Sequence, residues 1–212
     1  MTTDALMVEI RAVLKEGGEW CDLEKAHALA AIVLALRPRV VCEIGVWMGG
    51  SLVPIALALR ALRDLDIAAG REAIHRRAIA IDPWAKEASC AGQEGADQEW
   101  WASVDHDAAL AAFRGRLDRH GLAEIVEVVR ARSDDAPVPG HVGLLHIDGN
   151  HAEQATRDVA RFARSVTPGG ILVLDDLSWH GGHVRAARDL AESFGFRELY
   201  PLGTGIVMQR IG

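Results

Sequence analysis

Carboxylates follow two apolar runs in the second half of the sequence. The run 142–147 is followed by Asp148, and the run 171–174 is followed by Asp175 and Asp176. Adjacent strands lie about 4.8 Å apart, so the three carboxylates meet at one sheet edge if these runs are neighbouring strands. Carboxylates held together repel one another unless they share protons or bind a hard cation. The pattern therefore predicts a Mg²⁺ site, with Mn²⁺ as the next choice, because all three ligands offer oxygen.

A histidine lies close to these acids in the sequence. His151 follows Asp148 by three residues and opens a predicted helix, so its ring can return towards the same cavity. An imidazole placed there can take a proton from a ligand. The competing interpretation is structural: Asp176 caps a turn and Asp175 points into solvent.

Further histidines and a tryptophan follow the last of these acids. His180 and His183 could form a zinc site together with His151, but the Gly181-Gly182 pair between them is more typical of a loop. Whether Trp179, His180 and His183 contact a substrate is left open by the sequence.

Glycines and a further carboxylate follow two earlier apolar runs. Gly45 ends the run 40–44 and allows a tight turn, while Gly49-Gly50 lets a ligand approach the backbone N–H groups of the next helix. Asp82 ends the run 77–81, where an acid can accept both hydroxyls of a ribose. The alternatives are simple turn glycines and a loop carboxylate before Pro83.

The elements that must position these residues alternate along the chain. Helical spacing of apolar residues predicts helices over 4–15, 22–36, 52–62, 98–120, 151–166 and 184–194, with Asn150 suited to cap the fifth. Short apolar runs predict strands over 40–44, 77–81, 125–130, 142–147, 171–174, 197–200 and 205–209. The stretch 85–97 has no clear period and is expected to be an irregular segment over the strand ends.

This alternation predicts an α/β fold. Strands that alternate with helices form a mostly parallel sheet with helices on both faces, and the last two strands form a hairpin that adds one antiparallel strand. We expect seven strands in a single domain that spans residues 1–212 and begins with two helices within residues 1–37.

Composition limits the class of partner. The 212 residues carry a net charge of −7 with scattered Lys and Arg, which disfavours a nucleic-acid surface. No apolar run reaches the roughly 18 residues of a membrane span, and the N-terminus lacks a signal-peptide pattern. Three cysteines without a CxxC pair are typical of a reduced thiol set. We therefore expect a cytoplasmic protein with a small-molecule partner; self-association into a homo-oligomer is left open.

Taken together, these motifs resemble the class I S-adenosylmethionine-dependent methyltransferases over about Val40 to Gln209. Within that class, the segments LHIDGNH (145–151), Arg157-Asp158 and TPGGILVLDD (167–176) are similar to one branch. That branch holds the metal-dependent sugar O-methyltransferases of macrolide biosynthesis and the cephalosporin-hydroxylase-like proteins. Two departures are the absence of the large N-terminal region of the macrolide enzymes, and Asp175 where they carry Glu.

The resemblance implies a Rossmann-like methyltransferase sheet and a role for each motif residue. The methionine end of the cofactor would be lined by Glu43, Gly45, Gly49 and Ser51, the ribose held by Asp82, and the adenine placed near Ser133 and Asp134. Asp148 would lie beside the cofactor and bind a divalent cation with Asp175 and Asp176, and His151 would be the base.

The predicted activity is O-methyl transfer from S-adenosylmethionine to a hydroxyl of a small molecule of sugar or polyphenol type, assisted by Mg²⁺. One alternative keeps the cofactor but needs no metal, with His151 or Asp148 as the base. Another is a methyltransferase-like binding protein without activity. A nicotinamide dehydrogenase is disfavoured, because the GxxxG turn lacks the third glycine of the dinucleotide motif.

Overall fold

Seven strands form one sheet in the computed structural model, which describes residues 2–16 and 20–212. The strand order is β3-β2-β1-β4-β5-β7-β6, and β7 runs antiparallel to both of its neighbours while the other pairs are parallel. The strands are β1 (Val40–Ile44), β2 (Arg77–Asp82), β3 (Val126–Arg130), β4 (Val142–Ile147), β5 (Val166–Leu174), β6 (Phe196–Leu202) and β7 (Gly205–Arg210). The predicted sheet, with its one antiparallel strand, is confirmed.

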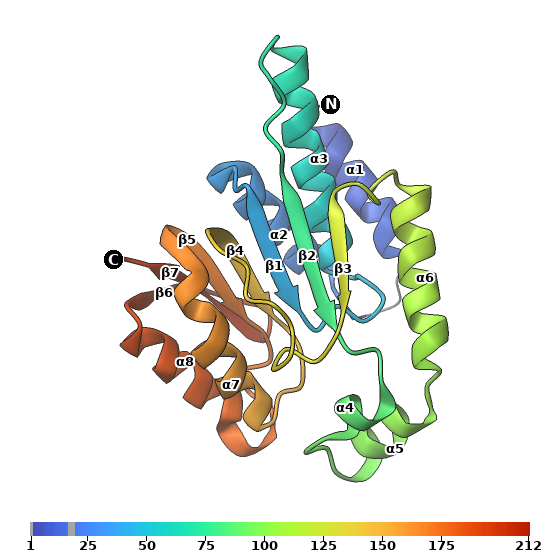
Figure 1. The fold of residues 1–212 in the computed structure, drawn as a ribbon, viewed down its shortest axis with the longest axis vertical. Helices are drawn as coiled ribbons and strands as arrows, with labels where there is room; N and C mark the ends of the chain where they lie inside the picture. The colour runs from blue at the N-terminus through green and yellow to red at the C-terminus, as the bar shows by residue number, and fades with distance from the viewer. Residues whose placement is uncertain (1, 17–19) are drawn as a thin grey trace.

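Helices cover both faces of this sheet (Figure 1). One face is covered by α1 (Thr3–Leu14), α2 (Leu23–Leu36), α3 (Leu52–Ala68) and α6 (His106–Arg119), and the other by α7 (Glu153–Phe162) and α8 (His183–Ser193). Each face has its own apolar core, because strands buried on both sides pack helices above and below. In the described residues, none of the helices combines the length and apolar character needed to cross a membrane.

The segment between β2 and β3 differs from its prediction. Residues 85–97 are not irregular throughout but contain α4 (Lys86–Cys90) and the start of α5 (Gly95–Ser103), which lie beyond the arrowheads of β1, β2 and β3 in Figure 1. The helix predicted over 98–120 is broken before α6. Asp105 has extended backbone angles and its side chain accepts the N–H of Ala108 at 2.9 Å, so it starts a new helix instead of continuing the old one.

The helix predicted over 151–166 is shorter at both ends. It begins at Glu153 after Ala152, and the Asn150 side chain accepts the N–H of Ala152 at 3.0 Å rather than capping the helix itself. It ends at Phe162 in a 3₁₀ turn (Ala163–Ser165), and β5 begins at Val166. Val166 pairs with Val142 and Ile171 with Leu144, so residues 167–170 bulge between two paired stretches, which explains how a proline fits there.

Candidate active site

A cavity of about 980 Å³ lies at the carboxyl ends of β1, β2, β4 and β5, which end at the same edge because they are parallel. This is the edge where α/β sheets bind ligands, and the volume is at the upper end of the range of about 300–1,000 Å³ for small-molecule sites. The predicted site residues on its wall are Gly45, Ser51, Asp82, Ser133, Asp148, His151, Asp175 and Asp176. Glu43, Gly49 and Asp134 are described but lie off that wall.

Gly45 brings the turn after β1 against the chain that follows β4. Its φ is +83°, and a Cβ at this position would lie 2.2 Å from the carbonyl oxygen of Asp148. Only glycine therefore allows both the left-handed conformation and the close approach. The turn after β1 is therefore packed directly against the backbone of Asp148, the first of the predicted metal ligands.

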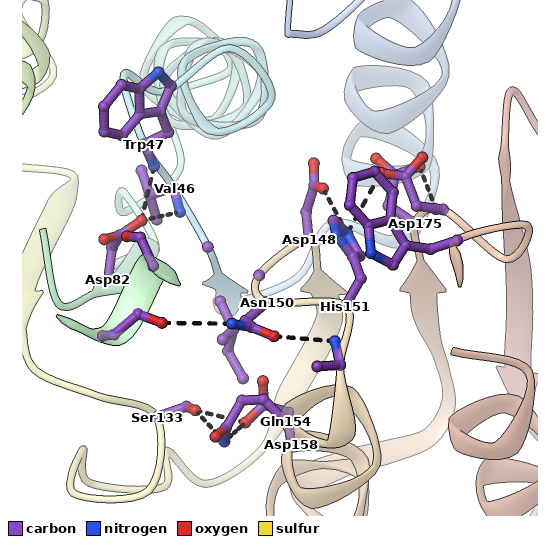
Figure 2. A pocket seen from close by; sticks show the side chains of 18 of the residues that line it. Val46, Trp47, Asp82, Ser133, Asp148, Asn150, His151, Gln154, Asp158 and Asp175 are labelled. Carbon is purple, nitrogen blue, oxygen red and sulfur yellow. Dashed lines mark hydrogen bonds and ion pairs between the residues drawn. The ribbon is translucent and has the colours of Figure 1, made fainter. Parts of the chain in front are cut away.

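Asp82 fixes the same turn from the neighbouring strand. Its carboxylate accepts backbone N–H groups from Val46 and Trp47, each at 2.9 Å, and from Trp84 at 2.7 Å, as Figure 2 shows for the first two. Burial raises the pKa of Asp82, and these N–H groups only partly oppose the rise. Three donors occupy most of the carboxylate, so its first role is to shape the turn; ribose binding stays a prediction.

Glu43 supports the turn from beneath the sheet edge. Its side chain is fully buried, accepting the Ser51 hydroxyl at 2.8 Å and lying 2.9 Å from Nδ1 of His146. His146 was not among the predicted site residues, although a histidine inside an apolar strand was a signal for such a buried pair. Gly49 has a packing role, since a Cβ there would lie 2.6 Å from the ring of Phe113 on α6. Neither Glu43 nor Gly49 lies on the cavity wall, and a role of either residue at the methionine end of the cofactor stays a prediction.

The predicted adenine end contains a buried polar network. The Ser133 hydroxyl donates to Oδ1 of Asp158 at 2.5 Å, and the Gln154 amide donates to both residues (Figure 2). The same amide also donates to Asp134 at 3.1 Å. Oδ2 of Asp158 is buried without a hydrogen bond to any described residue. Burial raises the pKa of Asp158 to about 6, against the lowering effect of the Ser133 and Gln154 hydrogen bonds.

We expect Asp158→Asn to stabilise the ligand-free protein at pH 8 and to change little at pH 4. A folded-state pKa of about 6 exceeds the usual value of 3.8. The native state thus binds the extra proton between these values, and wild-type stability falls as pH rises through 6. The asparagine amide keeps the contacts to Ser133 and Gln154 but carries no charge. Removing the buried charge should therefore raise the free energy of unfolding at pH 8 by at most about 3 kcal/mol. Thermal melts at both pH values test this; an equal change in Tm at pH 4 and pH 8 would contradict it.

The acids predicted as metal ligands do come together, but a lysine lies between two of them. Nζ of Lys25, on the first turn of α2, donates to Oδ2 of Asp148 at 2.8 Å and also to Oδ2 of Asp175. Burial opposes the charge of Lys25, but the two carboxylates outweigh it and raise its pKa. Burial also opposes the charge of Asp148, yet Lys25 and His151 hold its pKa well below the usual range.

Lys25 was missed because it lies far from these acids in the sequence. A signal was present: the chain has only three lysines, and this one stands three residues after Asp22, which caps α2 by accepting its N–H at 2.7 Å. A cation in a first helical turn opposes the helix dipole, so such a lysine needs another partner.

His151 lies on the other side of Asp148. Its Nε2 is 3.4 Å from Oδ2 of Asp176 and 3.8 Å from Oδ1 of Asp148, and it is buried without hydrogen-bond geometry to any described residue. The ring of Trp179 is 5.1 Å from the imidazole. Burial lowers the pKa of His151, but the carboxylates of Asp148, Asp176 and Asp175 outweigh it, so the net pKa is raised. The side chain of His180 lies outside the described residues, and His183 lines the cavity.

Four indole rings form a continuous aromatic wall on the α5 side of the cavity. Trp100 and Trp101 are 4.8 Å apart, and both contact Trp20 and Trp47 at 5.1–5.9 Å between ring centroids. All four line the cavity, and Trp20 and Trp100 remain 56% and 39% exposed. Such flat apolar faces bind planar rings or the apolar faces of sugars.

The strand order, the single antiparallel strand and the cavity at the strand ends define the fold of a class I S-adenosylmethionine-dependent methyltransferase. The chain belongs to the methyltransferase domain family, which it matches over residues 42–177. It is therefore an S-adenosylmethionine-dependent methyltransferase, as its motifs predicted. No curated protein was found that matches the sequence.

Solved structures with the same fold are distant in sequence. The O-methyltransferase from Bacillus cereus, in complex with S-adenosylhomocysteine, is 14% identical over 100% of this chain and 93% of that one, with a TM-score of 0.64. TomG from Streptomyces achromogenes, an O-methyltransferase of tomaymycin synthesis bound to S-adenosylmethionine, is 16% identical over 100% and 92%, with a TM-score of 0.61. The O-methyltransferase NovP is 18% identical over 90% and 81%, with a TM-score of 0.66.

Proposed function

We propose that this methyltransferase transfers the methyl group of S-adenosylmethionine to a hydroxyl oxygen of a small molecule, with His151 as the base. The observation that carries the proposal is the buried Nε2 of His151, which lies on the cavity wall between two carboxylates and has no hydrogen-bond partner among the described residues. Similarity of fold to the O-methyltransferases TomG and NovP supports oxygen as the acceptor atom.

In this proposal the protein positions and deprotonates the acceptor. The acceptor oxygen attacks the methyl carbon as the carbon–sulfur bond breaks, which leaves S-adenosylhomocysteine, and the hydroxyl proton passes to Nε2 of His151. Asp148 and Asp176 stabilise the imidazolium that forms, since both lie within 4 Å of Nε2. The cofactor would lie over the turn fixed by Gly45 and Asp82, which brings its methyl group to the same end of the cavity.

For the acceptor we propose a polyphenol or sugar that lies against the aromatic wall of Trp20, Trp47, Trp100 and Trp101. This wall supplies flat apolar contacts on one side of the cavity. The test is S-adenosylhomocysteine release with catechols, glycosides and free sugars, compared with amine analogues of the same shape. Turnover of the hydroxyl compounds alone supports O-methyl transfer, whereas turnover of only the amines would contradict it.

The sequence left both a Mg²⁺-assisted and a metal-independent form of the reaction open. The predicted ligands Asp148 and Asp175 do not fit a bridging divalent cation as they stand, because Lys25 already takes one oxygen of each. A second group of ligand atoms, from Asp148, His151 and Asp176, would consume the proposed base if it held an ion. We therefore propose the metal-independent form; magnesium assistance is the alternative that experiment must exclude.

The pH dependence of kcat should reveal the base. His151 must be neutral to accept a proton, and its pKa is raised above 6.5. We therefore expect kcat to increase with pH and to level off above a midpoint that lies higher than 6.5. Asp176→Asn removes one of the charges that raise the pKa, so the midpoint should move to lower pH in that variant. A midpoint that stays unchanged in Asp176→Asn would contradict His151 as the titrating group.

A further inference from the structure

Lys25 is the one lysine or arginine that forms an ion pair with Asp148 and Asp175 in the described part of the chain. Its side chain is 8% exposed, and it reaches from α2 to the ends of both β4 and β5, where Asp148 and Asp175 lie side by side in Figure 2. An ammonium has three N–H donors, and two of them are used by these carboxylates. Lys25 itself lines the cavity, so the third donor is available to a ligand there.

The position of Lys25 is unfavourable for the stability of the fold, unless its charge is compensated. Lysine is rarely this buried, and removing an ammonium from water needs close compensation by opposite charge. Its place in the first turn of α2 also sets it against the helix dipole. The other two lysines of the chain, Lys15 and Lys86, are exposed. Helix stability and burial both disfavour Lys25, which leaves the carboxylates as the reason for its place.

A divalent cation and Lys25 cannot share the space between these acids. Mg²⁺ binds its oxygen ligands at about 2.0–2.1 Å. An ion bridging Oδ2 of Asp148 and Oδ2 of Asp175 would therefore occupy the space that the ammonium fills, and the two positive charges would repel strongly there. The site accommodates one cation or the other.

We propose that Lys25 is the resident cation of this site and takes the place of a divalent metal. This inference rests on the proposed function. The ammonium neutralises Asp148 and Asp175, and its third N–H holds the acceptor oxygen beside His151, where it stabilises the negative charge that develops as the proton leaves. The acceptor is accordingly held by one hydrogen bond rather than by the two-point chelation that a metal offers to neighbouring hydroxyls. A lone hydroxyl should then serve as well as a vicinal pair.

A metal-binding experiment tests the role of Lys25 and needs no methyl-acceptor substrate. Metal-stripped wild-type protein is titrated with Mn²⁺ and followed by electron paramagnetic resonance, and we expect no site tighter than about 1 mM. Lys25→Met keeps the length of the side chain but frees the two carboxylates, so it should bind one Mn²⁺ at least about 100-fold more tightly. Lys86→Met, which removes an exposed lysine, is the matched control and should behave as wild type. The Mn²⁺ site should disappear again in Lys25→Met combined with Asp175→Asn.

The Mn²⁺ titration of the wild-type protein tests the proposal even if Lys25→Met does not fold. One Mn²⁺ per stripped wild-type chain at micromolar affinity, lost in Asp175→Asn, would overturn the proposal. With an active acceptor, we further expect full turnover in EDTA and a fall in kcat of about 10- to 100-fold in Lys25→Met. Absence of turnover with every acceptor, while the Mn²⁺ results hold and S-adenosylhomocysteine still binds, would instead count against the proposed function.

Discussion

His151→Ala is expected to lower kcat by about 10²- to 10⁴-fold, the usual contribution of a positioned proton acceptor. The imidazole nitrogen is buried on the cavity wall, and the described part of the chain offers it two carboxylates but no hydrogen bond. Removing the ring leaves the acceptor hydroxyl protonated as it attacks the methyl group. Steady-state kinetics across the pH range would measure the loss, and the pH-dependent rise in kcat should vanish along with it.

The matched control for this variant is His183→Ala. His183 also lines the cavity, but among the described residues its side chain forms no ion pair with His151, Asp148 or Asp175. We expect its kcat to stay within a few-fold of wild type, and both variants should keep the affinity for S-adenosylhomocysteine, because the turn around Gly45 is untouched. Equal losses of kcat in the two variants would mean that general damage to the cavity, rather than loss of a base, explains the effect.

Gly45→Ala should have the largest effect on folding. The new methyl group would lie 2.2 Å from the carbonyl oxygen of Asp148 and 2.4 Å from Cα of Gly149, both of them backbone atoms. The positive φ adds its own cost for an alanine. Since neither strand end can move without disturbing the sheet, we expect a loss of about 4 kcal/mol or more, which few single substitutions reach. Urea denaturation would measure this loss.

Gly121→Ala is the control that separates the steric clash expected in Gly45→Ala from the cost of placing an alanine at positive φ. Gly121 also has a positive φ, of +62°, but a Cβ there meets no atom within 4 Å. Its substitution should therefore cost only about 1–2 kcal/mol. If Gly45→Ala proved no more harmful than Gly121→Ala, the turn after β1 would not be pressed against the chain after β4 as the structure has it.

The sequence located the edge of the sheet where the cavity lies, and the reason is local. The parallel strands β1, β2, β4 and β5 each contain a short apolar run, and the residue that follows the run lies at the carboxyl end of the sheet. Asp82, Asp148 and Asp175 could therefore be placed on one cavity from their spacing alone, which the structure bears out. Helix ends were less predictable, because the break before α6 depends on one aspartate, Asp105, whose side chain accepts the backbone N–H of Ala108.

The sequence by itself determined how the strands and most helices alternate along the chain and which carboxylates meet, since these follow from apolar periodicity and from residues adjacent to strand ends. The family followed from the resemblance of its motifs to those of known methyltransferases. Only the tertiary structure decided what those carboxylates bind. Lys25 is 123 residues from Asp148 and 150 residues from Asp175, and it reaches them because α2 packs against the sheet with its first turn at the strand ends. No local pattern encodes such a contact. Whether an acidic cluster needs a metal or already has its cation is therefore set by packing between distant segments.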